Sequence, residues 1–204
     1  MTAIIDYGVG NLFSLKSSFA HIGEEAVVTS DRKVLSEASG IILPGVGAFE
    51  DAIAKLNASG LGEVLKEELK KGKPAMGICL GMQLLFDESL EYGCHKGLGL
   101  ISGTVRSISD VAGSGLKIPH MGWNALTIVK EDCPIFKYTK SGDHVYFVHS
   151  YCADDCDPYV AATAEYGAPL TASVARDNLF GCQFHPEKSG ETGLKILKAF
   201  CEME

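Results

Sequence analysis

The chain has 204 residues, of which 46% are hydrophobic and 22% charged, a composition typical of a globular protein with a sizeable core. The 26 acidic and 18 basic residues give a net charge of −8, which argues against nucleic acid as a partner. The sequence opens without a basic leader, and no apolar run is long enough to cross a membrane, so we expect neither export nor membrane insertion. No linker divides the chain, and residues 1–204 are expected to form a single domain.

The first half alternates between strand and helix patterns. Short apolar runs predict strands at residues 3–6, 26–29, 41–43 and 75–78. Helices are predicted at residues 11–21, 51–56, 61–71 and 80–86. Such alternation is typical of a parallel, doubly wound sheet, which gathers functional residues at the carboxyl ends of its strands.

The second half is richer in strands. These are predicted at residues 104–108, 125–129, 145–148, 159–165, 171–175 and 179–184. A last helix is predicted at residues 191–200. We therefore expect a three-layer α/β fold, with a flavodoxin-like, doubly wound and mostly parallel sheet and antiparallel additions in the second half.

Seven cysteines, an odd number in a chain without an export signal, favour a reducing cytoplasm over a disulfide scaffold. His149, Cys152 and Cys156 lie close enough in sequence to raise the alternative of a zinc site. Their spacing lacks a second matching ligand pair, so we expect solvated or core thiols and no metal.

Cys79 lies where a predicted strand turns into a predicted helix, between Gly77 and Gly81. This is the pattern of a nucleophile elbow, with cysteine in place of serine. Glycines on both sides suit a tight turn in which a Cβ would press on neighbouring backbone. A thiol at a helix N-terminus is favoured as the reactive thiolate, and the Leu80 N–H would form half of an oxyanion hole.

His185 and Glu187 follow the strand predicted at residues 179–184. In an extended segment, residues two apart project to the same side, and Pro186 disfavours a helix here. His185 is therefore the candidate general acid and base for Cys79, and Glu187 is the group that orients the imidazole. The sequence thus predicts a Cys–His–Glu triad.

These two segments, residues 77–83 and 185–187, resemble the class I glutamine amidotransferases. Four further segments resemble, more narrowly, the glutaminase subunits of imidazole glycerol phosphate synthase: residues 6–12, 44–49, 119–124 and 146–151. The resemblance covers nearly the whole chain, with its motifs in the expected order.

The resemblance implies a glutaminase that hydrolyses L-glutamine through a thioester on Cys79 and needs no cofactor. The glycine pairs at residues 8–10 and 45–47 lack the third glycine of a dinucleotide fingerprint. The second pair is better interpreted as a loop facing Cys79, in which Gly45, Val46 or Gly47 supplies the second oxyanion N–H. The implied substrate contacts are Gln83, Glu91, Ser150 and Tyr151.

The resemblance also implies a heterodimer with a (β/α)8-barrel cyclase, which uses the ammonia to make imidazole glycerol phosphate and AICAR in histidine biosynthesis. Exposed residues of the motifs are the expected docking face: Asn11, His120, Trp123, Tyr138 and Lys188. Three alternatives stay open: a stand-alone γ-glutamyl hydrolase, a glutaminase subunit of another synthase, and a non-catalytic module of the same fold.

Overall fold

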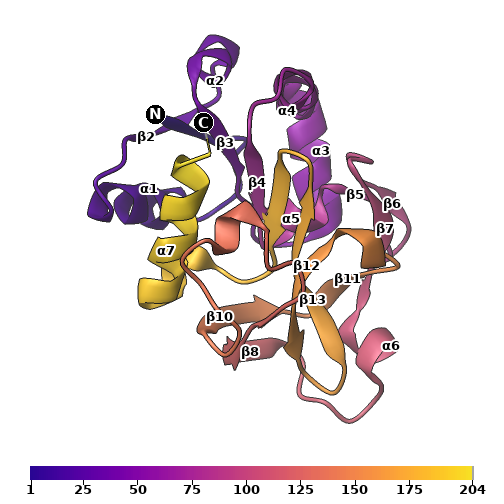
Figure 1. Ribbon diagram of the computed structural model, residues 1–204. Coiled ribbons are helices and arrows are strands. Elements are labelled where there is room, and N and C mark those ends of the chain that lie inside the picture. The colour runs from indigo at the N-terminus through magenta and orange to yellow at the C-terminus, as the bar shows by residue number, and fades with distance from the viewer. Residues whose placement is uncertain (204) are drawn as a thin grey trace.

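An eight-stranded sheet runs through the centre of the computed structural model, which describes residues 1–203 (Figure 1). Five neighbouring strands are parallel: β2 (Ala26–Thr29), β1 (Thr2–Ile5), β3 (Gly40–Leu43), β4 (Ala75–Ile78) and β14 (Leu179–Cys182). Three antiparallel strands continue it: β13 (Pro169–Arg176), β12 (Val160–Glu165) and β9 (Thr127–Ile128). The expected parallel sheet with antiparallel additions is confirmed.

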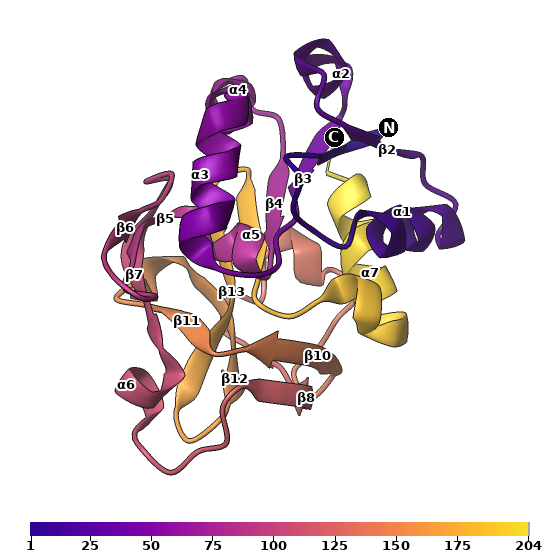
Figure 2. The same ribbon diagram turned by 180° about the vertical axis from the view of Figure 1, so that it is seen from behind.

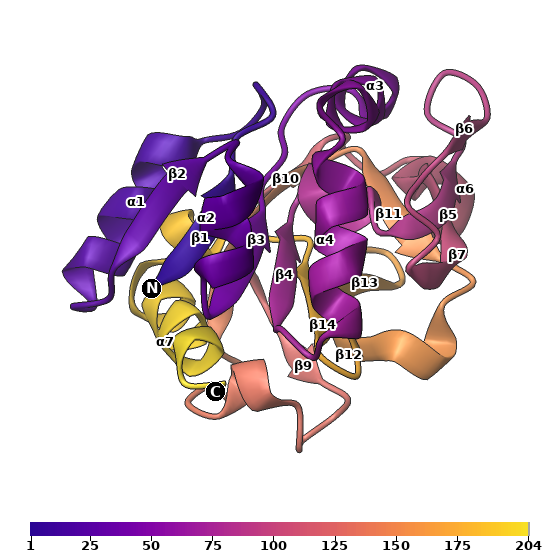
Figure 3. The same cartoon turned by 90° about the horizontal axis from the view of Figure 1, so that it is seen from above.

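Helices cover both faces of the parallel part, as Figure 3 shows from above. One layer consists of α1 (Leu12–His21) and α7 (Gly190–Cys201), and the other of α2 (Arg32–Glu37), α3 (Phe49–Ser59) and α4 (Leu61–Lys70). Successive side chains of β1 point to opposite faces of the sheet. Ala3 and Ile5 therefore pack with α2–α4, whereas Ile4 packs with α1 and α7. Every residue of this strand is buried, which explains why its last three residues, Ala3 to Ile5, are all apolar.

Two smaller sheets accompany the central one; in Figure 2, β8 and β10 lie at the lower right, and β5, β6 and β7 lie at the left. One pairs β10 (His144–His149) with β8 (His120–Ala125), and the other joins β11 (Tyr151–Asp154), β7 (Ile101–Ser107), β5 (Phe86–Ser89) and β6 (His95–Lys96). The remaining elements are short: α5 (Leu80–Gln83), α6 (Ile108–Ala112), η1 (Pro134–Phe136), η2 (Asp157–Tyr159) and η3 (Pro186–Lys188). Within residues 1–203, no helix combines the length and apolar character needed to cross a membrane.

The helix predicted at residues 80–86 is wrong beyond its first turn. Helix α5 ends at Gln83, and Phe86 already belongs to β5, where it pairs with Ile101. Leu84, Leu85 and Phe86 are all fully buried, and periodicity cannot assign such a continuous apolar run to helix or strand. The strand β8 and the helix α2 were not predicted either, because β8 alternates only weakly and α2 is short.

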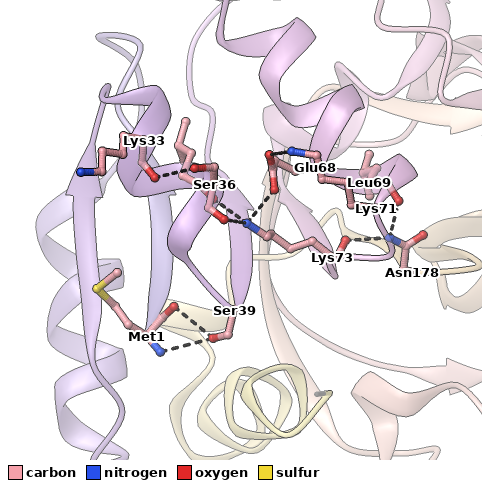
Figure 4. A network of polar contacts seen from close by, with 10 residues as sticks. Met1, Lys33, Ser36, Ser39, Glu68, Leu69, Lys71, Lys73 and Asn178 are labelled. Carbon is pink, nitrogen blue, oxygen red and sulfur yellow. Dashed lines mark hydrogen bonds and ion pairs between the residues drawn. The ribbon is translucent and has the colours of Figure 1, made fainter.

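An ion-pair network around the buried Glu68 joins α2 to α4 (Figure 4). Glu68, whose side chain is only 4% exposed, binds Lys71 Nζ at 2.6 Å and Lys73 Nζ at 2.7 Å. Lys73 Nζ also donates to the carbonyls of Leu35 and Ser36 at the end of α2. Burial would raise the pKa of Glu68, but the bonds from Lys71 and Lys73 hold it below its usual value.

Candidate active site

Cys79 occupies a strained turn between β4 and α5. Its backbone is left-handed, with φ 54° and ψ −114°, a conformation that costs energy in any residue with a Cβ. A Cβ on Gly81 would lie 1.9 Å from the Leu43 carbonyl oxygen, and one on Gly77 would lie 2.7 Å from the Gly81 oxygen. Both flanking positions therefore require glycine, and the predicted elbow is present.

His185 and Glu187 are in direct contact. His185 Nδ1 lies 2.8 Å from Glu187 Oε1, and the two side chains are 3% and 2% exposed. The contact was predicted from an extended segment, and this reason is wrong. Pro186 begins the 3₁₀ turn η3, so the backbone does not stay extended after His185. Proline fits the first position of such a turn because its fixed φ suits it and its missing N–H is not needed there. The turn, closed by a bond from Lys188 N–H to the His185 oxygen, brings the carboxylate back to the imidazole.

The charge on His185 is set by its two neighbours. Burial disfavours the imidazolium, but hydrogen bonds with Cys79 and Glu187 outweigh this effect and raise the pKa of His185 to about 10. With Nδ1 bound to Glu187, Nε2 is left for the sulfur. His185 can therefore hold a proton at neutral pH and stabilise negative charge on the sulfur of a cysteine nucleophile.

A cavity of about 350 Å³ opens in front of the sulfur. It brings together most of the predicted site residues: Val46, Gly47, Cys79, Leu80, Gln83, Glu91, Ser150, Tyr151, His185 and Lys188. Gly45 does not line the cavity. It packs against α5, where a Cβ would come within 2.6 Å of the Gly81 nitrogen. Its volume and the polar side chains of Gln83, Glu91 and Lys188 along it suit a small, polar substrate.

Comparison with known proteins agrees with this geometry. The family model "Glutamine amidotransferase class-I" matches residues 3–203. The chain belongs to the class I glutamine amidotransferase family. Among curated relatives, the imidazole glycerol phosphate synthase subunit HisH of Caldanaerobacter subterraneus subsp. tengcongensis is 52% identical over 100% of this chain and 98% of its own length. The protein of the same name from Syntrophotalea carbinolica is 49% identical, with both chains fully covered.

Solved structures of low sequence identity share the fold. A crystal structure described as a glutamine amidotransferase superposes with a TM-score of 0.74 at 18% identity, and 98% of each chain is covered. PurLQS from Thermotoga maritima gives the same TM-score at 21% identity, over 98% of this chain and 96% of that one. The three-layer amidotransferase fold expected from the sequence is thereby confirmed.

Gln83 reaches the far wall of the amidotransferase cavity. Its Nε2 donates to the Tyr151 carbonyl at 3.0 Å and to Gln183 Oε1 at 2.9 Å. Gln183 is fully buried, and its own amide nitrogen lies 3.8 Å from Cys79 Sγ. Gln183 was not predicted, although a polar residue in an apolar strand, two positions before His185, was a usable signal.

His149 was considered only as a metal ligand, but it lines the cavity and belongs to a chain of hydrogen bonds. Its Nδ1 faces the Tyr151 carbonyl at 2.8 Å, so this nitrogen carries the proton and Nε2 accepts from His120 Nδ1 at 2.9 Å. His120 Nε2 in turn faces the Asn124 amide at 3.3 Å. Burial lowers the pKa of His120 and lowers that of His149 to about 4. Both rings are therefore neutral, and the described contacts use all four ring nitrogens.

The expectation that His120 is exposed is wrong. The side chain points inward and stacks between the rings of Phe147 and Tyr166, with centroids at 4.7 and 4.1 Å. Cys152 and Cys156, the other two candidate zinc ligands, are also buried, and residues 1–203 contain no cluster of three metal-ligating side chains. Burial raises the pKa of Cys152 to about 12 and that of Cys156 to about 11, as expected for inert core thiols.

The predicted docking residues do not all share one face. Trp123 is 57% exposed and lies beside Gly190, at the start of α7. Lys188, in η3, is exposed, and Asn11, directly before α1, is half-buried. Tyr138 instead donates to Glu202 just past the other end of this 12-residue helix, roughly 18 Å away. The tyrosine beside Trp123 is Tyr146, its cross-strand neighbour, with ring centroids 6.1 Å apart.

Proposed function

We propose that this chain is the glutaminase subunit of an imidazole glycerol phosphate synthase. It hydrolyses L-glutamine to glutamate and ammonia, and it passes the ammonia to a cyclase partner in histidine biosynthesis. The observation that carries the proposal is Cys79 on its elbow, beside an imidazole that is bound to Glu187. Relatives about half identical over their whole length carry the corresponding name, which supports this assignment over other amidotransferases.

The first half of the reaction forms a thioester. The Cys79 sulfur attacks the side-chain amide carbon of glutamine, and the carbonyl π electrons move onto oxygen. The Leu80 N–H and one N–H of the loop at Gly45, Val46 and Gly47 would stabilise this oxyanion. His185 then gives its proton to the leaving nitrogen, the C–N bond breaks, and ammonia departs.

The second half releases glutamate. His185, now neutral, takes a proton from water while the water oxygen attacks the thioester carbon. The C–S bond breaks, and the sulfur leaves as thiolate beside the newly protonated His185. Glu187 keeps the imidazole in one tautomer and orientation throughout, because its Oε1 accepts the Nδ1 proton.

Substrate recognition is assigned to the opposite wall of the cavity. Glu91 supplies the negative charge that an α-ammonium needs, and the backbone of Ser150 and Tyr151 would bind the α-carboxylate. Gln83 is bound to the Tyr151 carbonyl, so we assign it to holding this segment in place beside its contact with substrate.

The partner proposed is a (β/α)8-barrel cyclase, docked over the mouth of the cavity. Met121 and Trp123 lie two residues apart on β8 and are 60% and 57% exposed, and Phe13 at the start of α1 is 83% exposed. Large exposed apolar side chains of this kind are typical of interaction surfaces. The seven free cysteines support the proposal that the heterodimer works in the cytoplasm.

Glutamate release from glutamine tests the proposal. It is measured for the chain alone, and with a cyclase subunit and its nucleotide ligand, and the Cys79→Ala variant serves as blank. We expect low release alone and a large rise in the complex. Equal release in both states would identify an independent hydrolase, and no Cys79-dependent release in either state would overturn the proposal.

A further inference from the structure

Helix α3 begins directly after the loop at Gly45–Gly47, and its own sequence provides no cap. Ala48 has the extended backbone of an N-cap residue, with φ −89° and ψ 143°, but no side-chain acceptor. The Phe49 N–H donates instead to Glu91 Oε2 at 2.6 Å, a carboxylate 42 residues further along the chain. This bond ties the residue that follows the Gly45–Gly47 loop to Glu91, which also lines the cavity.

The position of Glu91 is fixed by its own surroundings. The Leu90 N–H donates to the Val105 carbonyl at 2.9 Å, and the Glu91 N–H donates to Ser89 Oγ at 3.2 Å. Ser89 is fully buried, and Tyr92 turns the chain sharply with a φ of 53°. Since these bonds fix the backbone that leads into Glu91, the carboxylate can act as an anchor for Phe49.

The same carboxylate lines the cavity, together with Val46, Gly47 and Cys79. Only Glu91 Oε2 accepts a hydrogen bond from the described part of the chain. A carboxylate has two oxygens and about four acceptor sites, so it can hold the Phe49 N–H and an ammonium together.

We propose that Glu91 is a positioning residue for the oxyanion loop as well as a contact for the substrate ammonium. The inference rests on the proposed glutaminase function. An ammonium bound to Glu91 would hold that side chain in one rotamer. This rotamer keeps the hydrogen bond to the Phe49 N–H, and the bond in turn sets the position of the end of the Gly45–Gly47 loop. Glutamine binding and loop placement are then coupled, and the coupling free energy acts equally in both directions.

Two substitutions separate the two roles, measured as steady-state glutamate release in the complex with the cyclase subunit. Glu91→Gln keeps an acceptor oxygen for Phe49 but loses the charge. We expect KM for glutamine to rise about 10- to 100-fold while kcat stays within about threefold. Glu91→Ala loses both interactions, so KM rises similarly and kcat also falls about tenfold or more, because the oxyanion donor is misplaced.

A substrate without the ammonium isolates the loop. For glutaramate, which is glutamine without its α-amino group, the wild type and Glu91→Gln are expected to share the same KM within about twofold. Glu91→Ala is still expected to reduce kcat about tenfold with glutaramate, since the bond to Phe49 does not depend on the ammonium.

Two controls test for a merely structural role. Glu50→Gln removes a charge from the first turn of the same helix without touching the Phe49 N–H, and it should leave kcat and KM unchanged. Ala48→Ser gives α3 a cap of its own. In the Glu91→Ala background it should restore Tm and leave kcat low.

Restoration of kcat by Ala48→Ser would show that Glu91 acts only through helix stability, and would overturn the inference. Equal kcat for Glu91→Gln and Glu91→Ala would overturn it as well. Wild-type complex that releases no glutamate would overturn the proposed function itself, whatever the Glu91 variants do.

Discussion

Glu68 and Glu187 are both buried carboxylates, with side chains 4% and 2% exposed, yet they belong to different kinds of region. Both oxygens of Glu68 are bound by lysine ammonium groups, and one of these, that of Lys73, also holds the end of α2. Glu187 binds His185 through one oxygen, and its second oxygen has no partner among residues 1–203. In this chain, the buried carboxylate that belongs to the site is the one whose partner, His185, can change protonation and lines the cavity.

Of these two buried carboxylates, Glu187 is the one whose substitution should affect turnover most. Glu187→Gln keeps the size of the side chain but no longer fixes the tautomer of His185, so kcat for glutamine should fall about 10³-fold. Unfolding by urea should change little. If Glu187→Gln instead lowered the free energy of unfolding and left kcat unchanged, Glu187 would have a structural role like that of Glu68.

The converse change is Lys73→Met, which leaves the stem in place and removes the charge. Glu68 and the two carbonyls of α2 lose their donor, so the free energy of unfolding should fall by about 3 kcal/mol. Turnover of the folded complex should stay within about twofold, because the network does not touch the cavity. Urea denaturation and steady-state kinetics on one preparation check both statements.

The buried, neutral pair of His120 and His149 predicts how stability depends on pH. The pKa of His149 is about 4 in the folded chain and 6.5 in a model compound, so the unfolded state binds the extra proton first as pH falls. Stability should be fully present above about pH 6.5 and should be lost progressively down to about pH 4, by about 3 kcal/mol in total. His149→Gln should flatten this part of the curve in urea denaturation, and parallel curves for the two proteins would contradict the assignment.

The smallest effect concerns the partner. Trp123→Ala should weaken cyclase binding about 30-fold, because a half-exposed tryptophan suits an interface anchor. Tyr138→Ala is the matched control at the far end of α7 and should change Kd less than about twofold. Titration calorimetry distinguishes the two. Equal losses would restore Tyr138 to the docking face predicted from the sequence.

The contrast also shows what could be predicted from the sequence. The elbow and the parallel strands were predictable because buried strands and glycine-flanked turns are dictated by local sterics. The contact between His185 and Glu187 was predicted for the wrong reason, since spacing alone does not distinguish a strand from a 3₁₀ turn. The burial of His120 and the bond from Phe49 to Glu91 depend on packing between distant segments, which no local pattern encodes.

The central claim is that Cys79 is the nucleophile. The most direct test compares glutamate release by the complex for alanine variants of Cys79 and Cys94. Cys79→Ala should abolish release, with a loss of about 10⁴-fold or more, whereas Cys94→Ala, at an exposed thiol, should match the wild type. Similar release from both variants would contradict the account.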